Sequence, residues 1–205
     1  MRIYQTDALR GQRALVTGGS SGIGAAVCRA LAMAGARVVV NYLSDRDEAE
    51  KLVNEIRADG GEAMAIQADV SQEADVQRMF RDMIDAWGSV EILVANAGIQ
   101  RDAAFHDMSL DQWNMVMNVN LTGQFLCARE AARDVAERAA GGQRHPVVGL
   151  LAVGLDRVAQ LLEGGAGEVL VHDLRFLHAE KIRRVAPDPV HDPRQAGAHG
   201  VDVPG

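Results

Sequence analysis

Short apolar runs recur along the first half of the chain, and between them apolar residues return at helical spacing. Nearly continuous runs of this kind, rich in Val, Ile and Leu, are typical of strands buried on both faces. They predict four strands, at residues 13–17, 37–41, 63–67 and 90–95.

The segments between these strands carry apolar residues three and four positions apart, as a helix with one buried face does. We expect helices at residues 23–34, 49–56 and 76–87, and a long one from 110 to about 139. Ser71 is expected to start the third helix and Ser109 the fourth, because a Ser side chain accepts a hydrogen bond from the first turn. Three side chains of the third helix are expected in the core: Met79, Met83 and Trp87. His106 and Asp107 are expected to form a surface pair.

Strands that alternate with helices through short Gly-containing joints imply right-handed crossovers and a parallel sheet covered on both faces. The predicted fold class is therefore α/β, a doubly wound parallel sheet of Rossmann-like type. Such sheets bind ligands at the carboxyl ends of their strands.

The joint between the first strand and the first helix reads T-G-G-S-S-G-I-G at residues 17–24. A strand, a glycine turn and a helix N-terminus together form an anion site, since free N–H groups and the positive helix end point at one place. We expect Gly18 to permit the tight turn, Gly22 to let the backbone approach a pyrophosphate, and Gly24 to allow close packing. The spacing differs from the common G-x-G-x-x-G, and a glycine turn without a ligand is the alternative.

This turn resembles the cofactor loop of the short-chain dehydrogenase/reductase family, and three later segments resemble that family in order and spacing. They are Asp69-Val70, Asn96-Ala97-Gly98 and N-V-N-L-T-G at residues 118–123. The resemblance covers about residues 11–132 and is greatest to glucose 1-dehydrogenases and 3-oxoacyl-carrier-protein reductases. It implies an NAD(P)-dependent oxidoreductase that moves hydride between nicotinamide and a carbonyl or a sugar or alcohol hydroxyl.

The expected site follows from these segments. The resemblance implies Asn120 as the catalytic residue, and neither motif nor spacing predicts a metal ligand. The expected cofactor-binding residues are Thr17, Gly18, Ser20, Ser21, Gly22, Ile23, Gly24, Asn41, Arg46, Asp69, Val70, Asn96, Ala97 and Gly98.

Several of these residues have a second interpretation. Asp69 could cap the following turn, and Asn96 could satisfy the backbone of its own turn. Asn120 could be a polar residue in mid-helix that bonds to a carbonyl group. Arg46 could be a solvated residue at a helix start.

The choice of cofactor depends on the end of the second strand. An acidic residue there would bond the ribose 2′-hydroxyl and repel a 2′-phosphate. Here the position is Asn41, with Arg46 nearby. This combination favours NADP, or use of both cofactors, over strict use of NAD.

The residues that would complete the family's chemistry do not occur in this sequence. The resemblance implies a tyrosine as acid and base, a lysine four residues later that lowers its pKa, and an upstream serine. The only tyrosines are Tyr4 and Tyr42, the last serine is Ser109, and no Tyr-x-x-x-Lys occurs. An unassisted phenol, with a pKa near 10, is a poor acid or base at neutral pH.

Composition changes after residue 127. Residues 128–205 contain no Ser, Thr, Asn, Tyr, Trp, Cys or Met, and they hold all five prolines. With three exceptions they belong to the ten residue types that can be encoded by codons beginning with G or C. Two explanations stay open, an out-of-frame reading of a GC-rich gene and a genuine segment of biased composition. We therefore divide the chain into a dinucleotide-binding domain, residues 1–139, and an unassigned tail, residues 140–205. The tail could add strands at 145–153 and 168–171 and a helix at 155–162.

Three hypotheses for the chain follow. The first is the NAD(P)-dependent oxidoreductase, of which this chain carries only part of the active site. The second is a catalytically inactive NAD(P)-binding or interaction module. The third is a truncated or frameshifted product.

Charge and hydropathy limit the partners. The net charge of −7 gives no support to binding of nucleic acid or an anionic membrane, and no apolar run approaches the ~20 residues of a membrane span. We expect a cytoplasmic protein whose two cysteines form neither a disulfide nor a zinc site. The resemblance implies a small-molecule carbonyl or alcohol substrate for an active protein, and a homo-oligomer.

Overall fold

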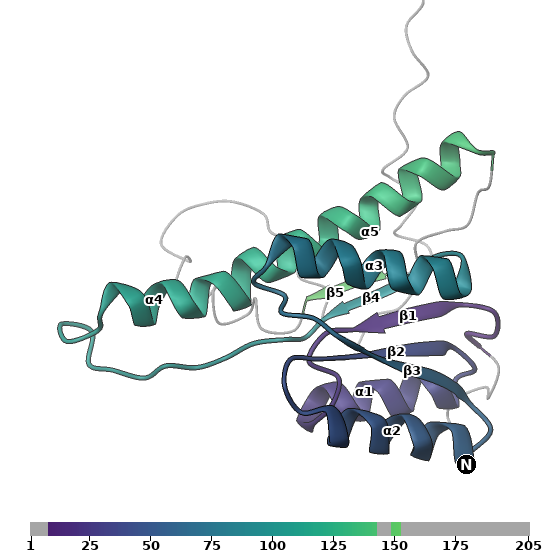
Figure 1. Cartoon of the computed structure of the whole chain (residues 1–205), viewed down its shortest axis with the longest axis horizontal. Helices are drawn as coiled ribbons and strands as arrows, with labels where there is room; N and C mark the ends of the chain where they lie inside the picture. The colour runs from purple at the N-terminus through teal and green to yellow at the C-terminus, as the bar shows by residue number, and fades with distance from the viewer. Residues whose placement is uncertain (1–7, 143–148, 153–205) are drawn as a thin grey trace, which may run out of the picture. The chain divides into compact units, whose positions relative to one another are not determined.

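A five-stranded parallel sheet lies between helices in the computed structural model, which describes residues 8–142 and the backbone of 149–152 (Figure 1). The chain divides into units 1–171 and 172–205, and every described residue belongs to the first. The strands are β1 (Arg13–Val16), β2 (Arg37–Tyr42), β3 (Glu62–Gln67), β4 (Ile92–Ala95) and β5 (Gly149–Ala152). The helices are α1 (Gly22–Met33), α2 (Arg46–Ala58), α3 (Glu73–Trp87), α4 (Leu110–Met117), η1 (Asn118–Thr122) and α5 (Gly123–Ala140).

The strand order is β3-β2-β1-β4-β5, with every neighbouring pair parallel. The chain moves outward from β1 to β3 and then crosses to the other side of β1. This reversal places a topological switch point between β1 and β4, where doubly wound sheets bind their ligands. The predicted fold class is confirmed.

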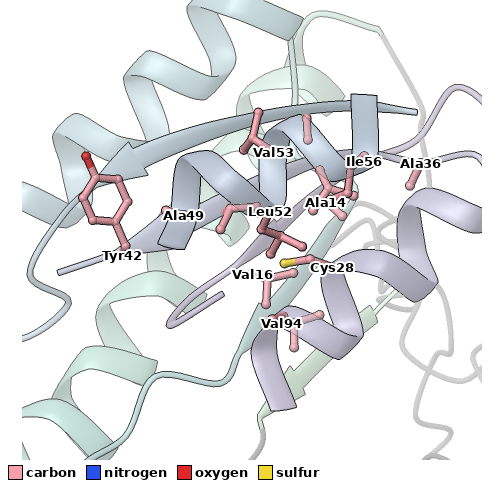
Figure 2. Packing of buried hydrophobic residues seen from close by; sticks show 14 of the residues in the cluster. Ala14, Val16, Cys28, Ala36, Tyr42, Ala49, Leu52, Val53, Ile56 and Val94 are labelled. Atoms are coloured by element: carbon pink, nitrogen blue, oxygen red, sulfur yellow. The ribbon is translucent and has the colours of Figure 1, made fainter. Parts of the chain in front are cut away.

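Each face of the sheet has its own apolar core. On one face Val16, Val38 and Val40 pack with Cys28 of α1 and Leu52 of α2 (Figure 2). On the other face α3 and α5 pack against strand residues of opposite parity. Met79 and Met83 are fully buried there and Trp87 packs partly buried against them, as predicted. Strand side chains alternate in direction, so neighbouring residues of β1 and β2 serve opposite cores.

The two cysteines belong to different cores, Cys28 beneath α1 and Cys127 beneath α5. Burial in apolar surroundings raises the pKa of each thiol to about 12. Both therefore stay protonated at neutral pH and act as small core residues.

Some predicted boundaries move. Helix α3 begins at Glu73 with Gln72 as its N-cap, so Ser71 does not start it. Ser109 does cap α4: its Oγ accepts from the Gln112 N–H at 3.2 Å, and the Gln112 side chain accepts from the Ser109 N–H. His106 and Asp107 form an exposed pair.

The predicted long helix is interrupted by a π-helical turn at η1. The expected strand at 145–153 has its described counterpart in β5, while the helix at 155–162 and the strand at 168–171 lie outside the described residues. The boundary after residue 139 stays a prediction. Among the described helices, none is both long and apolar enough to cross a bilayer.

Candidate functional site

A cleft of about 420 Å³ opens where the carboxyl ends of β1 to β4 meet. Each of these strands contributes the residues that follow it. Eleven of the predicted cofactor residues line the cleft: Gly18, Ser20, Ser21, Ile23, Gly24, Asn41, Asp69, Val70, Asn96, Ala97 and Gly98. The sheet topology thus brings together segments that are up to 80 residues apart in the chain.

Four of the predicted residues are not among those that line it. Thr17 lies beneath the turn with 2% of its surface exposed, and Gly22 sits at the first position of α1. Asn120 lies in η1 directly after Val119, which does line the cleft. The Arg46 side chain is 74% exposed and its Nε lies 3.9 Å from Oε1 of Glu50 on the same helix.

The glycine turn is shaped by three glycines. Gly18 and Gly22 have φ angles of +60° and +53°, a region that favours glycine. A Cβ atom on Gly24 would lie 2.2 Å from the Gly18 carbonyl oxygen and 2.6 Å from Nδ2 of Asn96. A Cβ atom on Gly22 would meet nothing within 4 Å. The turn is therefore tightly packed on the protein side and open on the other.

The N-terminus of α1 faces this opening. Ser21 is its N-cap in an extended conformation, its side chain makes no capping hydrogen bond, and no acidic residue lies in the first turn. The first N–H groups of a helix have no partner within the helix and carry partial positive charge. No Lys or Arg lines the cleft among the residues that the structure describes. A bound anion would therefore be held by backbone N–H groups and the helix end.

Asn96 joins the end of β4 to the glycine turn. Its Nδ2 donates to the carbonyl oxygens of Thr17 at 2.9 Å and Gly18 at 3.1 Å. In return, Oγ1 of Thr17 accepts from the N–H groups of Asn96 and Ala97, each at 3.0 Å. The two interpretations of Asn96 coexist, because its amide satisfies backbone groups and the residue also lines the cleft.

Asp69 organises the turn after β3. Its Oδ1 accepts from the Ser71 N–H at 2.9 Å and from Ser71 Oγ at 2.7 Å. The Asp69 N–H donates to the Asp75 carboxylate, and this bond, together with Arg78, holds the pKa of Asp75 below its ordinary value. The capping interpretation of Asp69 is therefore realised in a residue that also lines the cleft.

Asn120 lies within the π-helical turn η1. Its Oδ1 accepts from the Ile99 N–H at 2.8 Å and its Nδ2 donates to the Ile99 carbonyl at 2.9 Å. The side chain therefore reaches across to the segment that follows β4 instead of bonding within its own helix. π-helical turns occur frequently at functional sites, because the extra residue re-aims the side chains around it.

Sequence reasoning missed part of the cleft wall, namely Tyr42, Leu43, Ser44, Asp45, Ala68, Ile99 and Val119. Most of these directly follow or precede a predicted residue at a strand end. Their position just beyond the carboxyl end of a strand was the signal in the sequence that could have identified them as cleft residues. Val119 is different, because it reaches the cleft from η1 and not from the end of a strand.

Comparisons with known proteins agree with this geometry. The sequence profile of the short chain dehydrogenase family matches residues 12–143. A 3-oxoacyl-[acyl-carrier-protein] reductase of Synechocystis is 42% identical over 134 residues, which are 65% of this chain and 54% of the reductase. The versicolorin reductase of Emericella nidulans is 43% identical over 129 residues, 63% of this chain and 49% of its own.

Solved structures give the same picture. A short chain dehydrogenase from Burkholderia cenocepacia in complex with NADP is 41% identical with a TM-score of 0.60, over 62% of this chain and 52% of that one. A short chain dehydrogenase from Mycobacterium avium is 32% identical with a TM-score of 0.66, over 70% of this chain and 54% of that one. The chain spans about half the length of the curated relatives that it matches.

Proposed function

Because the chain belongs to the short-chain dehydrogenase/reductase family, we propose that its described domain binds NADP or NAD in the cleft at the strand ends. A member of the family that carries the full set of catalytic residues would then perform oxidoreduction between a nicotinamide and a carbonyl or a sugar or alcohol hydroxyl. The observation that carries this proposal is the glycine turn at the switch point, where the N-terminus of α1, without a side-chain cap or an acidic residue in its first turn, borders the open cleft.

The residues of the cleft suit the parts of a dinucleotide. The pyrophosphate would bind at residues 18–24 and the N-terminus of α1, as phosphates do at helix ends. Asp69 and Val70 would border the adenine, and the segment Asn96–Gly98 would border the nicotinamide half. When bound, the nicotinamide supplies or accepts the hydride.

We further propose that this chain holds the cofactor half of the site and only one residue of the chemistry, Asn120. The observation behind this is the absence of a Tyr-x-x-x-Lys from the 205 residues. Binding without turnover would make the chain an inactive NAD(P)-binding module. Sequencing the gene from the codon of Phe125 onward, and translating all frames, separates such a module from a frameshifted enzyme. A Tyr-x-x-x-Lys in another frame would identify the frameshift.

For the cofactor we propose NADP, or use of both cofactors. Asn41 places no carboxylate at the end of β2. Ser44 lines the cleft just beyond it, and the exposed side chain of Arg46 can turn toward a 2′-phosphate at the small cost of leaving Glu50. The relative from Burkholderia cenocepacia is in complex with NADP.

The test is a thermal-melting titration of the full chain with NADPH, followed by an assay for NADPH oxidation with a panel of carbonyl substrates. Binding to the folded state alone stabilises by about 2.7 kcal/mol at a hundredfold excess over Kd, so the melting temperature rises. We expect this rise without any turnover.

The variant Gly24→Ala separates binding at the turn from nonspecific stabilisation. Its added methyl group would collide with the Gly18 carbonyl, so the rise in melting temperature should disappear. Gly141→Ala is the matched control, because a Cβ atom there makes ordinary contacts at 3.5 Å and the φ angle is −76°. Failure of the wild-type chain to respond to NADPH would contradict binding, and measured turnover would contradict the inactive state.

A further inference from the structure

The side chain of Asn41 is almost fully enclosed, with 2% of the residue exposed. Its Oδ1 accepts from the Gly18 N–H at 3.1 Å. Its Nδ2 donates to the carbonyl oxygens of Ile66 in β3 and of Ala68 just beyond that strand, each at 3.2 Å. One amide therefore connects three segments that border the cleft.

These partners fix the orientation of the amide. A flipped amide would place Oδ1 against two carbonyl oxygens and Nδ2 against the Gly18 N–H, so every bond would become a repulsion. An aspartate at this position would keep one of these interactions and make the other repulsive. It would keep an acceptor for Gly18 and would present a carboxylate oxygen to Ile66 and Ala68, in a place closed to water.

The bonds of Asn41 act on the first residue of the glycine turn. Gly18 is held from two sides, at its N–H by Asn41 from β2 and at its carbonyl oxygen by Asn96 from β4. The Gly19 N–H also bonds to the backbone carbonyl of Asn41 at 2.8 Å. The first two N–H groups of the turn are thus occupied within the protein, and these bonds fix the start of the turn that leads into α1.

We propose that Asn41 is a positioning residue of the dinucleotide site, which fixes the glycine turn and does not read the ribose 2′ substituent. This inference rests on the proposed function. Selection between a 2′-hydroxyl and a 2′-phosphate then falls to the segment beyond β2, where Ser44 and Asp45 line the cleft. The two roles can be distinguished by measurement. Substitution of a positioning residue changes the affinity for NADPH and for NADH by the same factor, whereas substitution of a residue that contacts the 2′ substituent changes the two affinities by different factors.

The experiment measures the Kd of NADPH and of NADH for the full chain by nicotinamide fluorescence, in the wild type and in Asn41→Asp, Asn41→Ser and Gln67→Ala. Gln67→Ala is the control, since Gln67 also donates an amide hydrogen bond to backbone near the end of β2, to the Leu43 carbonyl, without contact to the turn. We expect both Asn41 variants to lose about tenfold or more in affinity for each cofactor, by the same factor, as for loss of a buried hydrogen bond. Gln67→Ala should bind as the wild type does.

Each outcome decides between the roles. If Asn41→Asp weakens NADPH much more than NADH, Asn41 reads the 2′ position and the inference is overturned. Unchanged affinities in a folded variant overturn it as well. If both Asn41 variants fail to fold while Gln67→Ala folds, the role of Asn41 is confined to the sheet, which also rejects the inference. A wild-type chain that binds neither cofactor rejects the proposed function itself.

Discussion

Glu91 shows how much one buried residue can contribute to this fold. It lies at the amino end of β4, away from the cleft, with its side chain 5% exposed. Arg13 of β1 donates to both carboxylate oxygens, through Nε and Nη2, each at 2.7 Å. Ser89 also donates to it, and Arg138 of α5 lies 3.7 Å away. One carboxylate therefore connects the sheet to α5.

The environment of Glu91 makes stability dependent on pH. Burial alone would raise its pKa, but the hydrogen bonds from Arg13 and Ser89 outweigh this and lower the pKa to about 2, from 4.5. A pKa lowered on folding stabilises the protein above about pH 4.5, and this stabilisation disappears as the pH falls toward 2. We expect Glu91→Gln to lower the free energy of unfolding at pH 7 by about 3 kcal/mol and to flatten its decline below pH 4.5.

Glu62→Gln is the control for this prediction. Glu62 pairs with Arg37 at 2.9 Å, but its side chain is 61% exposed. Removal of such a pair changes stability by about 0–1 kcal/mol. Urea unfolding between pH 2 and 7 compares the two variants. Equal losses of unfolding free energy in both would show that the buried Glu91 cluster stabilises the fold no more than an exposed ion pair does.

At the scale of elements, the predicted strands and helices agree with the structure. Burial on both faces produces the continuous apolar runs of the strands, and burial on one face sets the spacing of apolar residues in the helices. The π-helical turn η1 could not be predicted, because apolar spacing continues through residues 113–121 without a break. What holds the turn is the pair of bonds between Asn120 and Ile99, residues 21 positions apart. Such a contact exists only once β4 and the following helix are packed.

The start of α4 depends on a local signal that the sequence did reveal. The residues of α4 are half-buried or exposed, so its stability depends strongly on the Ser109–Gln112 capping box. Ser109→Ala should cost about 1 kcal/mol and speed amide exchange across Leu110–Met117. Ser109→Asp keeps an acceptor at the N-cap and should restore slow exchange. Hydrogen exchange read by mass spectrometry checks both variants, and equal exchange in wild type and Ser109→Ala would count against the cap.

At the scale of the whole molecule, the sheet explains why most of the candidate site could be predicted. The strand order brings the segments that follow β1, β3 and β4 to one edge of the sheet. Motif residues that are far apart in the sequence therefore become neighbours in the cleft. The direction of Asn41 could not be predicted, since it depends on the register that pairs Asn41 with Ile66. The Glu91 cluster was equally hidden, because its main pair, Arg13 and Glu91, is separated by 78 residues in the chain.

Hydrogen–deuterium exchange of the full chain with and without saturating NADPH tests most directly whether a dinucleotide binds at the glycine turn. We expect slower exchange at residues 18–24 and 96–99, which border the cleft, and unchanged exchange in α4. No change at residues 18–24, or protection confined to segments outside the cleft, would contradict dinucleotide binding at the glycine turn.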